Sequence, residues 1–597
     1  MNFDKLLFGS VLIFLISFFL TPATLAQTDT LAIVNGEPIT KDEFTTRFEL
    51  TVYPGKGLKA DLSDIKRKFL YSLVAEKLLS NQYITSSAVP DPDENQIKDE
   101  IEAIFLRDAL YRKEVLSQVK VGEKELKTGV RYAGYDYITD AVYFPDSLWA
   151  DSFFQKVKSG EKKYFYHVCD SLNLCHDTLQ IGYGESDETI ENAFFARDTG
   201  YVSNPTNTVD GWIVFRVINK KPDGKFSSAS PSEKAKIVHD LIAYRKSYRL
   251  GRDYLLNVMK GVEVNVNYRI FNPLVYKIKS ILATHRPTSF EGGYYLSRQE
   301  LRDLKDTFSF DPRAPILRFK SGELQLGYIF DNLSLAGFAP SDTSVREITF
   351  ALHSALKFII QNYFLAQKAL ELGLQESPEV KYNTRTFLDA YRSNRLITEL
   401  VDTVKITSNE VNNYFESHKD EVLKDIELRV QIFSLDNIDE AADVLNRLNK
   451  SNKLMPDTTG AIWLRASQLG EIGAVIAELD NGGIYGPIFL NGKFTIFRLL
   501  EKRSEVGRED INRSIQAAKD LLLEQKRNEV INKYIARLTS GQPTKIFESK
   551  LENVDVTPIQ MLTFRYIGFG GKIIATPSLY PREEWIKYLK DKQSILP

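Results

Sequence analysis

The chain repeats an order of segments at a nearly constant spacing, and this constrains its fold more than any other feature. Four segments recur in the same order: 31–44 with 317–330, 119–126 with 404–411, 190–205 with 472–487, and 213–221 with 495–503. The last three pairs are offset by 285, 282 and 282 residues. Few residues are identical, but the constant offset predicts one structural plan used twice. The entry to each copy, LAIVNGEPITKDEF and LRFKSGELQLGYIF, reads as a strand, a polar turn and a helix start.

Length and composition limit the function classes. A chain of 597 residues is too long for one core, and roughly four domains are expected. A formal net charge of −2 disfavours a surface that wraps nucleic acid. Aromatic residues make up 12% of the chain, and any that are exposed would suit a surface that holds apolar peptides.

The N-terminus carries an export signal. Lys5 is followed by an apolar run at 6–20, which is shorter than the roughly 20 residues that a membrane-spanning helix needs. Small residues at Thr24 and Ala26 predict a signal peptide, 1–26, cleaved after Ala26. An uncleaved anchor that keeps the chain near a membrane is the alternative. We therefore expect an exported protein, with the periplasm as the favoured compartment.

Two cysteines, Cys169 and Cys175, lie in HVCDSLNLCH at 167–176. In an oxidising compartment they are near enough to form a disulfide that clamps a hairpin. His167 and His176 add ligand types suited to zinc, although the spacing matches no familiar zinc signature. The disulfide is favoured, with free thiols and zinc as alternatives, and no metal or other cofactor is expected.

Periodicity divides the chain into helical and mixed parts. TKDE at 40–43 is a capping box, in which the side chains of Thr40 and Glu43 bond each other's backbone N–H, so a helix begins there. Strand-like segments follow at 135–144 and 211–221. The remaining expectations are long helices at 231–259 and 505–538, an irregular hinge at 265–315, and a tail after Gln542 that either adds strands or covers an edge.

Several of these segments resemble a known family. LAIVNGEPITKDEF, FLYSLVAEKLLSNQY and LYRKEVLSQVKVGEKEL resemble the N-terminal helical region of exported parvulin-type (PpiC) peptidyl-prolyl isomerases and of SurA-type periplasmic chaperones. LAQKALELGLQESPEV and VKITSNEVNNYFESHKDEV look like the same region again, and ELRVQIFSLDNIDEAADVLNRLNKS resembles the first strand and helix of a parvulin domain. The resemblance covers most of the chain in two copies. It implies a small module, a four-stranded antiparallel sheet with packed helices, that acts on X–Pro bonds of unfolded chains.

Both modules depart from the family at its active-site positions. The family's first-strand His is replaced by Gln431 in the second module and by Ala141 in the first. A second family His is replaced by Ile213 and Phe494. The resemblance therefore implies two degenerate parvulin frames, and no catalytic residue is assigned.

The expected fold class is α+β, with mainly helical chaperone-like domains alternating with the two modules. The expected divisions are a signal peptide 1–26, a helical domain 27–130, a module 131–222, a helix and linker 223–315, a second helical domain 316–420, a second module 421–504, and a C-terminal helix and tail 505–597.

The expected function is that of a periplasmic chaperone of the peptidyl-prolyl isomerase family. It would bind unfolded exported or outer-membrane polypeptides without isomerase catalysis, and neither nucleic acid nor a small-molecule cofactor is expected as a partner. The candidates for client contact are apolar side chains, with packing in the core as the alternative for each, namely Phe194, Phe195, Trp212, Trp463, Ile472 and Phe489. An active isomerase and a scaffold that docks one folded envelope partner are the alternatives.

Overall fold

The structure is a computed structural model. It describes residues 29–54, 56, 62–86, 92–158, 164–171, 176–208, 211–285, 293–333, 335–418, 426–435, 438–450, 460–469, 471–490, 493–504, 511–557, 559, 563–590 and 592–596. The signal segment and its cleavage site lie outside these residues. No helix in the part of the chain that the structure describes is both long enough and apolar enough to cross a membrane.

The chain divides into two compact units. The smaller unit contains Arg112–Tyr254, and the larger contains Thr21–Tyr111 together with Leu255–Pro597. The range 27–130, expected to be one helical domain, is therefore divided between the units. The physical reason is that α4 (Glu123–Tyr132) buries its apolar face against α9 (Pro231–Val258) of the smaller unit, through Leu126, Val130, Val238 and Ile242.

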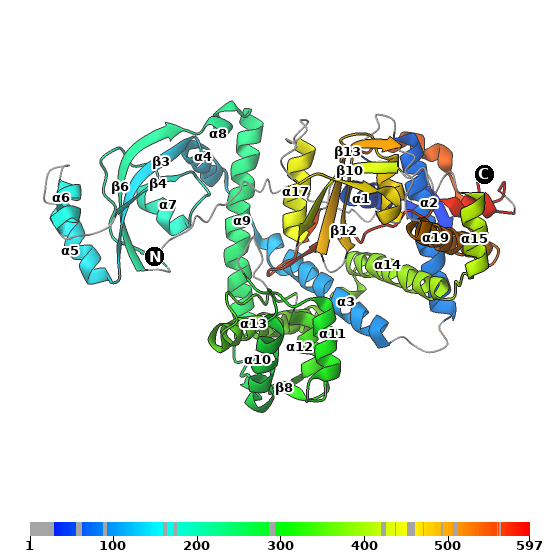
Figure 1. Cartoon of the computed structure of the whole chain (residues 1–597). Coiled ribbons are helices and arrows are strands. Elements are labelled where there is room, and N and C mark those ends of the chain that lie inside the picture. The colour runs from blue at the N-terminus through cyan, green and yellow to red at the C-terminus, as the bar shows by residue number, and fades with distance from the viewer. Residues whose placement is uncertain are drawn as a thin grey trace. The chain divides into compact units, whose positions relative to one another are not determined.

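Module 1, in the smaller unit, is a four-stranded antiparallel sheet of order β4-β3-β6-β5. Its strands are β3 (Tyr135–Phe144), β4 (His176–Ile181), β5 (Thr206–Thr208) and β6 (Gly211–Pro222). Helices α5 (Ser147–Lys158) and α6 (Tyr164–Ser171) cover one face, and α7 (Glu188–Phe194) covers the other (Figure 1). A short helix, α8 (Gly224–Ser228), leads to α9, and a 3-10 turn at Leu116–Gln118 precedes α4.

Module 2, in the larger unit, has the same topology, with order β11-β10-β13-β12. Its strands are β10 (Ile426–Leu435), β11 (Ile462–Arg465), β12 (Ile484–Leu490) and β13 (Lys493–Ser504). Helix α17 (Ile438–Lys450) packs on one face, and α18 (Glu471–Glu478), preceded by a 3-10 turn at Ala466–Leu469, packs on the other. Helix α15 (Ser408–Ser417) precedes the sheet and packs on α19 (Ile511–Leu538), as α4 packs on α9.

Each repeat opens with a hairpin and a helix, as the sequence predicts. The elements are β1 (Thr30–Val34), β2 (Glu37–Thr40) and α1 (Lys41–Leu50) in the first, and β8 (Pro315–Phe319), β9 (Gly322–Gln325) and α12 (Leu326–Leu333) in the second. Thr40 caps α1, since its hydroxyl oxygen accepts the Glu43 N–H at 3.1 Å. A third strand joins each hairpin: β14 (Thr544–Ile546) pairs with β1, and β7 (Asn265–Val266) pairs with β8. The tail therefore adds a strand.

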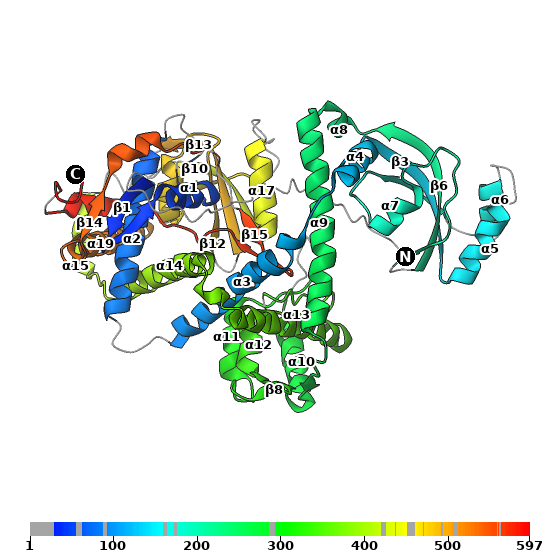
Figure 2. The ribbon, with the colours of Figure 1, turned by 180° about the vertical axis from the view of Figure 1, so that it is seen from behind.

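The helices of the larger unit form two cores. Helices α2 (Ser63–Ser86) and α14 (Pro378–Asp402) pack around the first hairpin, and Figure 1 and Figure 2 both show α14 beside α2. Helix α3 (Pro92–Glu114) contacts α14 through the rings of Phe105 and Phe387. Helices α10 (Tyr268–Leu282), α11 (Arg298–Thr307) and α13 (Val345–Glu371) pack around the second hairpin. The expectation of an irregular hinge at 265–315 is thus wrong, because Ile270, Leu274, Ile278 and Leu282 form a buried helical stripe on α10.

The C-terminal tail packs back on the first core. It contains β14, β15 (Phe564–Tyr566), β16 (Lys572–Ile574) and 3-10 turns at Glu548–Asn553 and Glu584–Tyr588. A further 3-10 turn, at Leu374–Glu376, precedes α14. Trp585 in the last turn, here called η6, is fully buried, and its indole N–H donates to the Tyr71 carbonyl at 3.2 Å.

Candidate functional site

The register of the two sheets fixes which residues correspond. In module 1 the β3–β6 ladder shifts after Ile138 and then pairs six residues, from Thr139↔Val217 to Phe144↔Trp212. In module 2 the β10–β13 ladder shifts after Arg429 and also pairs six, from Val430↔Leu499 to Leu435↔Phe494. The two ladders therefore superpose pair by pair.

This register corrects the assignment of the active-site positions. Gln431 pairs with Arg498, and the corresponding pair in module 1 is Asp140 with Arg216. Gln431 therefore corresponds to Asp140 and not to Ala141. The bulge that fixes the register cannot be read from the sequence, which is why the alignment slipped by one residue.

The same one-residue correction applies to the partner strands, β6 in module 1 and β13 in module 2. Phe494 corresponds to Trp212, and the counterpart of Ile213 is Thr495. A slip of one residue turns a side chain to the opposite face of a sheet. Ala141 and Ile213 lie on the α7 face of module 1, whereas Phe494 packs with α17 on the other face of module 2, where Gln431 also points.

The α7 face of module 1 is a filled aromatic core. Phe194 and Phe195 stack with ring centroids 5.2 Å apart, and Tyr137 lies 4.6 Å from Phe195. The two Phe side chains are 0% and 5% exposed, and Ala141 and Ile213 are buried among them. Phe194 and Phe195, expected to contact clients, are therefore core residues in this structure.

The opposite face of the module 1 sheet holds a buried polar cluster that the sequence analysis missed. Asp140 is 1% exposed and accepts hydrogen bonds from Thr178 Oγ1, at 2.7 Å, and from the Tyr166 hydroxyl. The Arg216 guanidinium lies 4.8 Å from the Tyr166 ring, and its Nη1 is buried with no hydrogen-bond partner among the described residues. Burial raises the pKa of the Tyr166 hydroxyl, and its hydrogen bond to Asp140 raises it further.

Module 2 keeps the arginine and changes its surroundings. Arg498 is buried, and its Nε and Nη1 have no hydrogen-bond partner among the described residues. Gln431 stands where module 1 has Asp140, and Glu440 of α17 is buried on the same side of the sheet. The sequence signal was the Phe-Arg pair that recurs at 215–216 and 497–498 inside strands of apolar alternation.

The other expected client contacts are scattered. Trp212 is half-buried against the α5–α6 side of module 1, and Ile472 is half-buried on α18. Trp463 lies on the edge strand β11, 36% exposed, with the Arg503 guanidinium 4.2 Å from its ring. The side chain of Phe489 lies outside the described residues. The structure does not bring these side chains together into one surface.

The cysteine expectations remain untested. Cys169 is a buried free cysteine on α6, and burial raises the pKa of its thiol to about 11. Cys175 lies outside the described residues, so the disulfide stays a prediction. Within the described ranges, no group of three or more His, Cys, Asp or Glu side chains could hold a metal ion.

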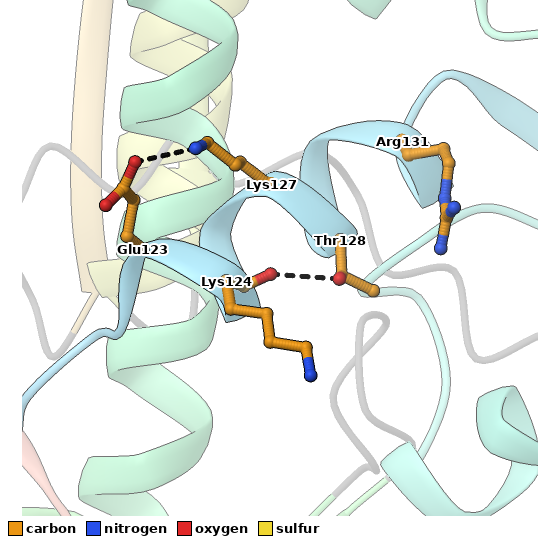
Figure 3. A pocket seen from close by; sticks show the side chains of 5 residues that line it. All are labelled: Glu123, Lys124, Lys127, Thr128 and Arg131. Carbon is orange, nitrogen blue, oxygen red and sulfur yellow. Dashed lines mark hydrogen bonds and ion pairs between the residues drawn. The ribbon is translucent and has the colours of Figure 1, made fainter.

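A hollow of about 370 Å³ lies on the surface of α4 (Figure 3). All five lining residues come from that helix, namely Glu123, Lys124, Lys127, Thr128 and Arg131. Lys127 is paired with Glu123 at 2.6 Å, and the Thr128 hydroxyl donates to the Lys124 carbonyl (Figure 3). Because one helix face supplies all the side chains, no groups converge on a reacting atom, and the hollow offers a charged surface only.

An exposed apolar stripe follows the long helix α9. Ile237, Tyr244 and Tyr248 are 53%, 53% and 67% exposed, and their spacing of seven and four residues places them on one side of the helix. Val238 and Ile242, on a different side, hold α9 against α4. The stripe is therefore a solvent-facing apolar surface on a helix that is already anchored.

The corresponding helix of the second repeat, α19, is covered. Counted from the helix starts, Asn528 occupies the position that Tyr248 has in α9, and it accepts a hydrogen bond from Arg582 of the tail at 3.2 Å. Further along α19, the Lys533 ammonium lies 5.8 Å from the Tyr588 ring of η6. In the second repeat the tail thus contacts α19 at the position of Tyr248, whereas Tyr248 of α9 is 67% exposed.

Comparison with known proteins gives only distant likenesses. No protein-family model and no curated protein matches the chain. Among solved structures, the chain is similar to the peptidyl-prolyl isomerase PrsA of Bacillus cereus, with 14% identity over 39% of this chain and 93% of that one, at a TM-score of 0.17. It is also similar to a SurA-like chaperone structure from Campylobacter jejuni, with 17% identity over 38% and 98% of the two chains, at a TM-score of 0.20.

A third similar structure is PrsA of Bacillus subtilis, with 18% identity over 38% of this chain and 93% of that one, at a TM-score of 0.12. The solved structures that the chain resembles are thus PrsA-type isomerases and SurA-like chaperones. TM-scores of 0.20 and below are too low to establish a shared fold, and they do not decide what this chain does.

Proposed function

We propose that this protein is an exported chaperone that binds unfolded polypeptides through exposed apolar surfaces and does not catalyse prolyl isomerisation. The observation that carries the proposal is the exposed apolar stripe on α9, Ile237, Tyr244 and Tyr248. On α19 the chain's own tail contacts Asn528, the counterpart of Tyr248. Soluble proteins seldom expose such surfaces without using them to bind.

The chemistry of module 1 supports binding without catalysis. An isomerase needs an open apolar pocket for proline and polar groups that favour the twisted amide. The α7 face of module 1 is filled by Phe194, Phe195 and Tyr137. The buried polar residues Asp140 and Arg216 lie on the opposite face, so pocket and polar groups do not meet.

The first test replaces the stripe. Ile237→Ser, Tyr244→Ser and Tyr248→Ser in one chain remove the apolar surface. The matched control, Lys236→Ser, Arg249→Ser and Asp253→Ser, introduces as many serines at exposed positions of the same helix. Aggregation of an unfolded β-barrel membrane protein is followed by light scattering. About fivefold more of the stripe variant than of wild type should be needed to suppress half of the aggregation, since three apolar contacts with the client are lost. The control should match wild type.

A proline-limited refolding assay on the wild-type chain distinguishes a binder from an enzyme. Stoichiometric protein should suppress aggregation and leave the rate of the slow, proline-limited phase unchanged. If a small fraction of an equivalent accelerates that phase, the proposal of a non-catalytic chaperone is wrong. If the stripe variant suppresses aggregation as well as wild type, α9 is not the client surface.

A further inference from the structure

A cavity of about 860 Å³ lies at the C-terminal end of α19, within the larger unit. Three parts of the chain line it. They are the end of α19 with the turn that follows it, the paired strands β1 and β14, and the terminal segment from Tyr588 onward. None of these three parts belongs to either module or to the α9 stripe.

The cavity is lined by four cations and by no carboxylate. Lys533 is paired with Glu529 outside the lining. Arg537, Lys545 and Lys590 have no ion pair with any described carboxylate, although Arg537 lies 6.0 Å from the Tyr534 ring. The C-terminal end of α19 adds a partial negative charge, which one cation offsets, so the remaining charge of the lining is positive. A ligand with a negative charge is favoured there.

The wall between the cations is apolar. Ile33, Ala536, Leu589 and Ile595 supply aliphatic surface, and the ring of Tyr588 borders it. Tyr588 is 40% exposed, so its ring is available to a ligand as well as to Lys533. An apolar side chain next to a negative group would match this lining.

The outer side of strand β14 borders the cavity at Thr544, which is 5% exposed. The Asn35 N–H donates to the Pro543 carbonyl and the Phe547 N–H donates to the Leu31 carbonyl, both at 2.8 Å, so residues 543, 545 and 547 face β1. The alternation of an antiparallel ladder turns the N–H and C=O of Thr544 to the outer side of β14. On that side Ile546 N–H donates to Ile595 O at 2.7 Å, and no backbone partner of Thr544 is among the described residues.

We propose that this cavity binds an extended polypeptide segment that carries a carboxylate. The segment's backbone adds to the edge of β14 at Thr544, one apolar side chain enters the cavity, and the carboxylate lies among Arg537, Lys545 and Lys590. The backbone of Thr544, which borders the cavity, favours a polypeptide over another apolar acid, because only a peptide backbone can pair with both its N–H and its C=O. The inference rests on the proposed function, of which it names a second, charge-selective client site.

The test uses short peptides with a neutral fluorescent label, alternating in apolar and small polar residues. One ends in a free carboxylate, one in an amide, and one in an amide with a Glu near the end. Fluorescence anisotropy measures binding to the mature chain and to the variant Arg537→Gln, Lys545→Gln and Lys590→Gln. These three side chains are exposed, so the fold should be kept. The matched control, Lys124→Gln, Lys127→Gln and Arg131→Gln, removes as many cations from the surface of α4 shown in Figure 3.

The peptide with a free carboxylate should bind the cavity variant about tenfold more weakly than wild type, since three exposed charge contacts are lost. The control should bind as wild type does, and added salt should weaken wild-type binding. If the amide that contains Glu binds, the site accepts side-chain carboxylates. If that peptide does not bind, the site accepts only the carboxylate of a chain end. Both results are consistent with the proposal. If the uncharged amide binds as tightly as the acid, or if the cavity variant is unaffected, the proposal is wrong.

Two further outcomes separate this site from the general function. If wild type and cavity variant both suppress aggregation of an unfolded client while peptide binding ignores the cavity substitutions, this inference fails and the chaperone proposal stands. If wild type suppresses no aggregation, the chaperone proposal fails whatever the peptides do. Binding of sodium oleate without binding of any peptide would assign the cavity to a lipid acid and overturn the inference.

Discussion

The two helical cores of the larger unit differ in a way that their shared plan does not predict. Core 1 is formed by side chains of α1, α2, α14 and α19, and core 2 by side chains of α10 to α13. Core 1 buries six charged side chains, namely Glu43, Arg47, Lys56, Glu76, Lys77 and Asp389. Between Tyr268 and Glu371, in core 2, no polar or charged side chain that the structure describes is buried.

Five of these charges form a network of two contact groups, which start from the neighbouring residues Glu76 and Lys77 of α2. Arg47 donates to both carboxylate oxygens of Glu76, at 2.9 and 3.2 Å. The Lys77 ammonium lies 3.0 Å from Glu43 and 3.8 Å from Asp389, which also accepts the Ser80 hydroxyl at 2.6 Å. The network therefore joins α1 and α2 of the first repeat to α14 of the second.

The difference matches how each core is assembled. Core 2 is built from one nearly continuous stretch of chain, whereas core 1 joins segments from both ends and from the middle. Apolar surfaces pack in many registers, but a buried pair is stable only in one geometry, because desolvation is costly when the partner is absent. We infer that the charges of core 1 select the correct long-range pairing and that core 2 has no need of them.

The largest effect should follow from breaking the pair at its centre. Arg47→Met leaves the Glu76 carboxylate buried and unpaired and should lower the free energy of unfolding of core 1 by about 3–5 kcal/mol. Arg47→Met with Glu76→Leu should recover most of this loss, because two apolar side chains fill the same space without desolvating a charge. Urea unfolding of the three chains measures the effect.

A surface ion pair on α2, the helix that carries Glu76, serves as the control. Arg67 lies 2.6 Å from Asp64, and both side chains are more than 40% exposed. Arg67→Met should cost no more than about 1 kcal/mol. If Arg47→Met costs as little as Arg67→Met, the buried network does not hold core 1 together and the contrast between the cores has no energetic meaning.

Core 2 should respond to loss of volume instead. Leu352 of α13 is fully buried, and Leu352→Ala should cost about 3 kcal/mol through lost burial and the cavity that remains. Hydrogen exchange should accelerate in α10 and α13 and stay unchanged in α1 and α2. Phe350→Ala, at a mostly exposed position of the same helix, should change stability by about 0.5 kcal/mol or less. Faster exchange in α2 as well would show that the two cores unfold together.

Much of the local structure was readable from the sequence, because it rests on short-range signals. The alternation in 135–144 predicted β3 with its bounds, and the cap at Thr40 marked the start of α1. The helix at 231–259 was found within one residue. Helix α10 was missed because YRIFN follows VNVN, and the short window read as a strand although the longer stripe from Ile270 to Leu282 is helical.

The long-range features were out of reach for physical reasons. A bulge sets the register of each sheet, so sequence alignment could not place Asp140 opposite Arg216. The pairing of α14 with α2 joins segments that are separated by about 300 residues, and no local pattern specifies it. The α9 stripe was missed as well, since exposure of Tyr244 and Tyr248 depends on what else in the fold covers the helix.

A smaller, pH-dependent difference between the cores should come from Lys56, a buried amine at the end of α1. Its ammonium donates to the carbonyls of Phe48, Glu49 and Thr51, the last two at 3.3 Å, and so caps the helix. Burial lowers the pKa of Lys56 to about 8. Above pH 8 the folded chain releases this proton while the unfolded chain, with an ordinary lysine pKa, keeps it. Since the unfolded state then binds more protons, the stability of core 1 should rise with pH.

The rise should approach but not exceed about 2 kcal/mol between roughly pH 8 and 9.5, since that is the limit for one proton over that window. Near pH 10 stability should begin to fall again. Burial raises the pKa of Tyr53, so its hydroxyl stays protonated in the folded chain and ionises in the unfolded chain, and the folded state then binds more protons. The urea midpoint of each core, read by hydrogen-exchange mass spectrometry with intrinsic rates corrected for pH, measures it. Lys56→Met should abolish the rise, and core 2, in which no described lysine is buried, should show none. An equal rise in core 2 would mean that the whole unit titrates as one body, and the charged core would lose its separate pH response.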